Sequence, residues 1–128
     1  MRKAYTFEGA PKKLGPYSHA VSMNGFVFVS GQGPIVPETN QVIEGGISAQ
    51  VRQTLENLKY ILEQAGTGLH NVVKVNAYLL HMSDFAAFNA VYADYFTADQ
   101  PVRTTIAADL PLGVLVEIDC IAGLDQAG

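Results

Sequence analysis

Residues 20–30, with the sequence AVSMNGFVFVS, contain the clearest fold signal in this chain. Asn24 and Gly25 lie between two apolar stretches, residues 20–23 and 26–30, and both turn residues tolerate the positive φ that a type I′ turn requires. The stretch therefore predicts a tight β-hairpin near the beginning of the fold.

The segments on either side of this hairpin are punctuated by glycine and proline. Residues 2–7 predict a short first strand, and Gly15-Pro16-Tyr17 predicts a loop before the hairpin. After the hairpin we expect an irregular loop as far as Gly45-Gly46. A helix of about 17 residues follows, with Ser48 as its N-cap and Gly66 as its left-handed stop. Its apolar face recurs at helical spacing in Val51, Leu55, Leu58, Leu62 and Ala65.

The second half of the chain alternates strand and helix patterns. Residues 72–80 predict a strand. A second helix is expected to begin after Ser83 or Asp84, and residues 102–108 and 114–122 predict two more strands. The strand at 72–80 is expected to place Val73, Val75, Ala77 and Leu79 on one side. The apolar face of the second helix is expected to contain Phe85, Phe88, Tyr92 and either Tyr95 or Phe96.

These elements predict an α+β fold for a single domain over residues 1–128. Six strands would form one mixed sheet with two helices packed on a single face. The other face of the sheet then needs a cover, and a second copy of the same chain would supply it, so we expect a homo-oligomer.

Composition limits the classes of function. The 128 residues are 48% hydrophobic and carry a net charge of −4, with no basic cluster larger than Lys12-Lys13, so we expect no nucleic-acid partner. The single cysteine, Cys120, fits a reducing compartment, and the cytoplasm is the expected location. No apolar run reaches the length of a signal peptide or a membrane span, so we expect no membrane association.

One arginine lies inside an otherwise uncharged strand pattern. Alternation places Arg103 and Thr105 on the same face of residues 102–108. A guanidinium at such a position needs an anion. Two hypotheses remain open: an ion pair at an interface between copies, or an anchor that holds a substrate carboxylate through two parallel hydrogen bonds.

Two carboxylates share a face in the last predicted strand. Glu117 and Asp119 alternate with apolar residues, so they are expected on the side opposite Cys120. Either could solvate the sheet, pair with Arg103 from a neighbouring strand, or act as a general acid or base. Tyr17 follows Gly15-Pro16 on a loop, where a phenol could close over a ligand or simply pack.

Other candidate motifs do not support a cofactor. Gly31-Gln32-Gly33 has Val36 where a dinucleotide fingerprint needs its third glycine. The three histidines, His19, His70 and His81, lack metal-ligand spacing, so we expect no metal site and place them on the surface or in turns. Cys120 is expected to be a buried core residue and not a nucleophile.

Four segments together resemble the Rid family, the YjgF-like reactive-intermediate deaminases. They are Gly15-Pro16-Tyr17-Ser18, Ser30-Gly31-Gln32-Gly33-Pro34, Asn89-Ala90-Val91-Tyr92, and Pro101-Val102-Arg103 running to Val116-Glu117-Ile118. The resemblance covers almost the whole chain. It implies a chorismate-mutase-like (YjgF-like) fold and a homotrimer with clefts between subunits.

The same resemblance implies cofactor-independent hydrolysis of 2-imino acids to 2-keto acids and ammonia. It makes Arg103 the carboxylate anchor and Glu117 and Tyr17 catalytic. Substrate-binding residues would be Ser30, Gly31, Gln32, Asn89 and Thr105. Activation of a water beside an already electrophilic imine carbon would need no metal.

Two positions depart from the family pattern and leave the substrate open. Many relatives have a cysteine where this chain has Thr105, and bulkier aliphatic residues are common where it has Gly33. The alternatives are a pathway-specific deaminase acting on an aminomuconate-like or aminoacrylate-like substrate, and a sensor that binds carboxylate metabolites without turnover.

Overall fold

The computed structural model describes residues 1–125, and ten strands and helices lie in this range. In chain order they are β1 (Lys3–Tyr5), β2 (Ala20–Met23), β3 (Phe26–Gln32), β4 (Ile35–Val36), β5 (Gln41–Val42), α1 (Ile47–Gln64), β6 (Val72–Leu79), α2 (Phe85–Tyr95), β7 (Val102–Ala107) and β8 (Val116–Gly123). Short 3₁₀ segments occur at Leu69–Asn71, Met82–Asp84 and Pro111–Gly113.

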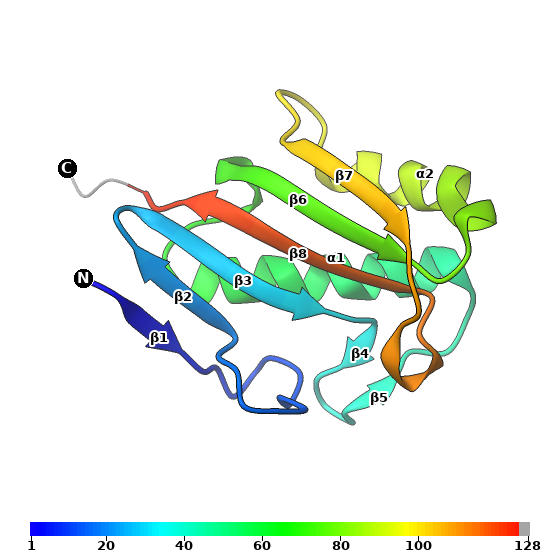
Figure 1. The fold of residues 1–128 in the computed structure, drawn as a ribbon, viewed down its shortest axis with the longest axis horizontal. Coiled ribbons are helices and arrows are strands. Elements are labelled where there is room, and N and C mark those ends of the chain that lie inside the picture. Colours follow the sequence, from blue (N-terminus) through cyan, green and yellow to red (C-terminus); the bar gives the residue numbers. More distant parts are fainter. Residues whose placement is uncertain (126–128) are drawn as a thin grey trace.

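The main sheet has six strands in the order β1-β2-β3-β8-β6-β7. All neighbours are antiparallel except β6 and β7, which are parallel and joined through α2. Both helices pack on one face of this sheet (Figure 1). The predicted α+β architecture with two helices on a single face is therefore confirmed.

The hairpin at residues 20–30 forms as predicted. Met23 pairs with Phe26 across the turn, and Asn24 and Gly25 have φ values of 53° and 82°. These positive values are what a type I′ turn requires, so the two turn residues determine the register of β2 and β3.

Helix α1 differs from the prediction at its beginning and agrees with it at its end. The N-cap is Gly46 rather than Ser48, because Gly46 is extended and its carbonyl accepts the hydrogen bond from Gln50 N. The chain leaves the helix through Ala65, and Gly66 has a left-handed φ of 98°. Glycine adopts that conformation without steric cost, which explains the stop.

Three further details correct the predictions. Val73 is exposed rather than buried with Val75, because the β6–β8 register shifts between Val72 and Lys74. The stretch before α1 is not wholly irregular, since Ile35 pairs with Val42 in the small β4–β5 ladder. In α2, Phe88, Tyr92 and the following Phe96 are buried whereas Phe85 is exposed. Asp84 does occupy the N-cap of α2, although its side chain makes no capping hydrogen bond.

The core lies between the sheet and the helices. Its largest fully buried side chains come from α1, α2 and the inward rows of the central strands: Phe88, Leu55, Leu58, Ile61, Leu62, Leu79, Ile118, Val27, Val51, Val75, Val116 and Thr54. Cys120 belongs to the same cluster and is 3% exposed, as expected for a core residue. Within residues 1–125, no helix has both the length and the apolar character needed to cross a membrane.

The face of the sheet away from the helices has several exposed apolar side chains. They are Met23, Phe26, Phe28, Val102 and Ile106. Strand alternation and register place them opposite the buried rows, with Met23 next to Phe26. This face is uncovered in the single chain.

Candidate functional site

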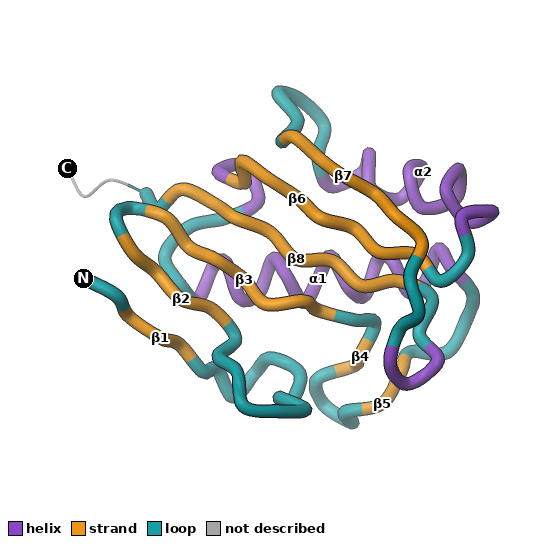
Figure 2. The backbone as a smooth tube through the Cα atoms, in the orientation of Figure 1, coloured by secondary structure: helices purple, strands orange, loops and turns teal. Residues whose placement is uncertain are grey.

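A cavity of about 360 Å³ lies at one end of the sheet, where β3 ends and β8 begins. Figure 2 shows that the loop before β2, the β4–β5 hairpin and the turn before β8 gather around this end. The lining residues are Pro11, Lys12, Leu14, Tyr17, His19, Ser30, Gly31, Gln32, Gly33, Ile35, Pro111, Leu112, Val114 and Glu117. Five predicted site residues, Tyr17, Ser30, Gly31, Gln32 and Glu117, therefore meet in one cavity.

A bulge in β3 shapes the floor of this cavity. The β3–β8 register shifts between Val29 and Gln32, so Ser30 and Gly31 fall outside the regular ladder. Ser30 donates hydrogen bonds from both its N–H (3.0 Å) and its hydroxyl (3.1 Å) to the carbonyl of His19. The bulge is thereby fixed to the beginning of β2.

Gly31 leaves space for the Glu117 carboxylate. A Cβ atom at position 31 would lie 2.4 Å from Glu117 Oε2 and 3.0 Å from Cδ. Only glycine allows the carboxylate to lie this close to the β3 backbone. The glycine in the Ser30-Gly31-Gln32 segment thus has a steric role that the sequence did not reveal.

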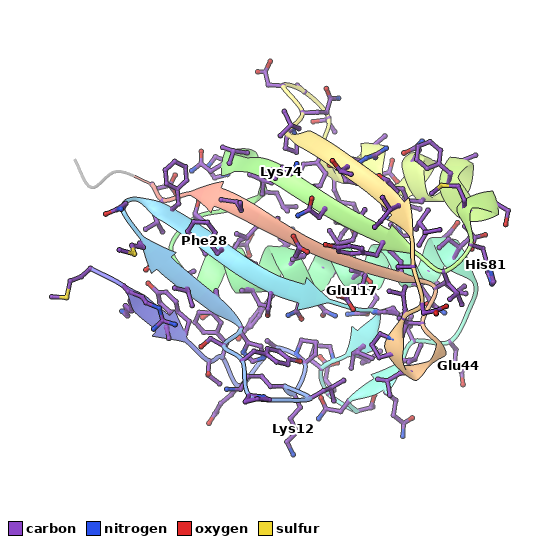
Figure 3. All side chains as sticks on the ribbon, viewed as in Figure 1. Lys12, Phe28, Glu44, Lys74, His81 and Glu117 are labelled. Carbon is purple, nitrogen blue, oxygen red and sulfur yellow. The ribbon has the colours of Figure 1, made fainter. Side chains whose placement is uncertain are left out.

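Glu117 and Asp119 share a face, as predicted, but their environments differ. Asp119 accepts hydrogen bonds from Asn76 Nδ2 and from the Tyr78 hydroxyl, both at 3.0 Å. The Glu117 side chain lies on β8 beside the end of β3 (Figure 3) and lines the cavity, and within residues 1–125 its carboxylate accepts no hydrogen bond. Burial, with a smaller contribution from the Asp119 charge, raises the pKa of Glu117 above its usual value. A partly buried carboxyl with a raised pKa can exchange protons with a ligand.

Tyr17 reaches the cavity from a loop that is folded on itself. Its N–H donates to the Gly15 carbonyl (2.9 Å), and its hydroxyl oxygen accepts a hydrogen bond from Leu14 N (3.0 Å). The side chain remains 42% exposed. The hydroxyl hydrogen is not used in these contacts and remains available to a ligand.

The prediction that all three histidines lie on the surface or in turns is wrong for His19, which is 3% exposed. Its Nδ1 accepts a hydrogen bond from Phe7 N at 3.0 Å, so Nε2 carries the proton and donates to the Pro11 carbonyl at 2.8 Å. The imidazole thereby ties the loop at residues 7–11 to the beginning of β2 and supports one wall of the cavity.

Arg103 lies elsewhere, on the edge strand β7. Its guanidinium is 4.7 Å from the centre of the Tyr92 ring and 5.1 Å from that of Phe88, both on α2. Within residues 1–125 it makes no salt bridge, since the two ion pairs there are Arg52–Asp94 and His70–Asp125. The cation is held by aromatic faces and has no carboxylate partner.

The hypothesis that Glu117 lies on a strand next to Arg103 is wrong for the single chain. Strand β6 separates β7 from β8, and Arg103 shares a lateral row with Val75 and Cys120. That row faces the helices, whereas Glu117 projects from the other face. Because alternate residues of a strand point to opposite faces, no side-chain rotation brings these two groups together.

Two other predicted residues lie with Arg103 rather than with the cavity. Thr105 follows on the same face of β7, and its hydroxyl is buried without a hydrogen-bond partner, as is that of Tyr92. Burial raises the pKa of Tyr92, and the Arg103 charge opposes this only in part. Asn89 is partly buried on α2. The predicted site therefore forms two groups: the cavity group, and a β7–α2 group that comprises Arg103 and Thr105 on β7 and Asn89 on α2, the helix whose rings face Arg103.

The sequence analysis missed two buried polar residues on α1 that support the cavity. Asn57 Nδ2 donates to the carbonyls of Gly33 (3.0 Å) and Ile35 (2.8 Å), and Gln50 Oε1 accepts from Leu115 N (2.8 Å). They were detectable as polar residues at helical spacing beside the apolar stripe of α1. No group of three His, Cys, Asp or Glu side chains in the described part of the chain is arranged to hold a metal ion.

Comparison with known proteins gives consistent results. The family model described as Endoribonuclease L-PSP matches residues 7–124. A RutC family protein of Pyrococcus horikoshii is 47% identical over 123 residues, which are 95% of this chain and 98% of that protein. The chloroplastic Reactive Intermediate Deaminase A of Arabidopsis thaliana is 40% identical over 124 residues, 96% of this chain and 66% of the relative. The crystal structure of RidA from an Antarctic Psychrobacter superposes with a TM-score of 0.91 at 38% identity, covering 95% of this chain and 99% of that one.

Proposed function

This chain belongs to the endoribonuclease L-PSP family, which includes reactive intermediate deaminases, and from this membership and the site geometry we propose that it hydrolyses 2-imino acids to 2-keto acids and ammonia. Such imines tautomerise with the enamines that pyridoxal-phosphate enzymes release. The reaction needs a group to hold the carboxylate, a water on the imine carbon and a group that moves protons.

The observation that carries this proposal is the Glu117 carboxylate, which lies over Gly31 in the cavity without a protein donor. A carboxylate in a partly buried site favours a ligand that brings its own N–H or water hydrogen. An iminium nitrogen and an attacking water both do so. The raised pKa makes the Glu117 carboxylate a better proton acceptor than an ordinary glutamate.

The steps balance without a cofactor. Glu117 accepts a proton from water as the water oxygen bonds to the iminium carbon, giving a tetrahedral aminoalcohol. Glu117 returns that proton to the nitrogen. The carbon–nitrogen bond then breaks, ammonia leaves, and Glu117 accepts the hydroxyl proton as the keto group forms. That proton passes to ammonia or to solvent, which restores the Glu117 carboxylate. Tyr17, whose hydroxyl hydrogen is available, supplies a hydrogen bond within the same cavity.

Arg103 enters this scheme from a second copy of the chain. A guanidinium that is stacked on aromatic rings and lacks an acidic partner is suited to a planar carboxylate. It cannot reach the cavity of its own chain, because it lies on the other face of the sheet. We propose a homotrimer in which each cleft combines the cavity group of one subunit with the β7–α2 group of the next. The exposed apolar side chains on the open face, among them Phe26 and Phe28, support such an assembly.

The test generates 2-imino acids with an amino-acid oxidase in the presence of semicarbazide, which traps imine that has not been hydrolysed. The native protein should suppress semicarbazone formation, and Arg103→Ala and Glu117→Gln should each weaken the suppression greatly. Arg52→Ala and Glu56→Gln are matched controls, since both residues lie outside the cavity, in exposed contacts between α1 and α2.

Three results would contradict the proposal. Full imine hydrolysis by Arg103→Ala would exclude its role as carboxylate anchor. Binding of 2-keto acids with no turnover of any imine would favour the sensor hypothesis. A monomer by light scattering at assay concentration, with full activity, would exclude a site shared between subunits.

A further inference from the structure

The cavity that contains Glu117 also has an apolar wall that the proposed chemistry does not use. Leu14, Ile35, Leu112 and Val114 line it. Leu14 and Leu112 are 67% and 62% exposed, so much of their apolar surface is accessible to a ligand in the cavity. Cavities that bind small molecules commonly combine such apolar walls with a few polar groups.

The backbone of this wall is held in place by α1. Asn57 bonds to the carbonyls of Gly33 and Ile35, and Ile43 N donates to the Pro34 carbonyl at 2.8 Å. On the other side, Gln50 holds Leu115, which follows Val114. Because both segments are tied to one helix, the space between them does not collapse readily when it is empty.

Gly33 keeps this space open. A Cβ atom at position 33 would have a single near neighbour, Ile35 Cγ1, at 4.0 Å. The residue does not have the positive φ that would restrict it to glycine. A larger side chain is therefore sterically permitted at this position, and its Cβ atom would lie next to Ile35, which also lines the cavity.

Leu112 is presented in an uncommon conformation. Its φ is +59°, which bulky side chains rarely adopt, and it lies within the Pro111–Gly113 turn. A polar residue or glycine would adopt this backbone with less strain, and it would also avoid the exposed apolar surface. Both disfavoured features occur at the cavity, where contact with an apolar ligand would compensate for them.

We propose that this wall binds the side chain of the substrate and that Gly33 and Leu112 determine its specificity. The substrates are then 2-imino acids with a branched or long aliphatic side chain. The inference rests on the proposed function. The imine derived from leucine would place its side chain against Leu112 and Ile35, beside Gly33. The imine derived from alanine would leave the wall empty.

The experiment compares kcat/KM for imines generated from alanine, 2-aminobutyrate, leucine and glutamate. The native protein should prefer the leucine-derived imine. Gly33→Val should lower kcat/KM for that substrate by about tenfold or more, because one or two carbons in an apolar pocket have effects of this size, and should leave the alanine-derived imine nearly unchanged. Leu112→Gly, which also relieves the positive φ, should reduce the preference in the same direction. Gly46→Thr is the matched control, since threonine has the shape of valine and is favoured at the N-cap position that Gly46 occupies, while Gly46 has open space around it and lies outside the cavity.

The outcomes separate this inference from the proposed function. Hydrolysis of no imine at all would remove the proposed function and this inference with it. Hydrolysis with the same substrate ratios in the native protein, Gly33→Val and Leu112→Gly would overturn the subsite and leave the deaminase intact. A preference for the glutamate-derived imine would also overturn it, and would indicate that Lys12 at the cavity selects a second carboxylate.

Discussion

Replacement of Gly31 by alanine is the sharpest test of the site geometry. The new Cβ would lie 2.4 Å from Glu117 Oε2, whereas ordinary contacts begin near 3.4 Å. The carboxylate must therefore move by about 1 Å, and a misplacement of this size can lower catalytic efficiency about 100-fold. That factor corresponds to about 2.7 kcal/mol of transition-state stabilisation. The obstructing atoms belong to the end of a flexible side chain, so we expect little loss of folding stability.

The assay is a double-mutant cycle with the leucine-derived imine as substrate. We would measure kcat/KM for the native protein, Gly31→Ala, Glu117→Gln and the double variant, together with the melting temperature of each. If Gly31 acts only by allowing the position of Glu117, the alanine substitution should cost about 100-fold in the native background. In the Glu117→Gln background, where the carboxylate is already absent, Gly31→Ala should leave kcat/KM almost unchanged.

Two outcomes would refute this reasoning. Native kcat/KM in Gly31→Ala would mean that the Glu117 position over the bulge is irrelevant to catalysis. An equal loss in both backgrounds would mean that Gly31 acts through its own backbone or through folding rather than through Glu117. A large fall in melting temperature would support the second explanation.

Three other substitutions or reactions test the surroundings of the site. Burial raises the pKa of Glu117 in the folded protein above its value in the unfolded chain. Between these two pKa values the folded protein binds more protons than the unfolded chain, so the free energy of unfolding falls as pH rises through that window. Glu117→Gln should therefore raise the melting temperature at pH 7 and have little effect well below the usual pKa of glutamate. Asn57→Ala leaves two carbonyls without donors and should lower the free energy of unfolding by about 2 kcal/mol in urea titrations, together with kcat/KM; unchanged values of both would contradict its role in holding the wall. Burial raises the pKa of Cys120 to about 12, so a thiol reagent should react only after denaturation, and fast reaction of the native protein would show that β8 opens.

Local patterns predicted most of the fold because each was enforced by nearby residues. Asn24-Gly25 strongly favours a type I′ turn, and the spacing of Val51, Leu55 and Leu58 matches one helix face. The predictions were wrong where backbone pairing or backbone hydrogen bonding determines the local structure and no side-chain pattern marks it. A register shift turned Val73 outward, and Gly46 rather than Ser48 begins α1 because its own carbonyl accepts the first helical bond.

The candidate site was also predicted in part from local patterns, and the rest depended on contacts between distant segments. Alternation in two strands placed Arg103 with Thr105 and Glu117 with Asp119, and both pairings hold. The sequence did not distinguish Glu117 from Asp119, because that difference comes from Asn76 and Tyr78 on a strand about forty residues earlier in the chain.

The sequence by itself determined the elements, their apolar faces and the residue types available for chemistry, because these depend on neighbours three or four positions away in a helix and two in a strand. The tertiary structure alone decided strand order, and with it the insertion of β6 between β7 and β8. That order separates Arg103 from Glu117 by one strand, and the register between the strands places the two side chains on opposite faces. Both features depend on how strands distant in sequence assemble into one sheet. It also placed Gly31 beneath a carboxylate contributed by a residue far along the chain.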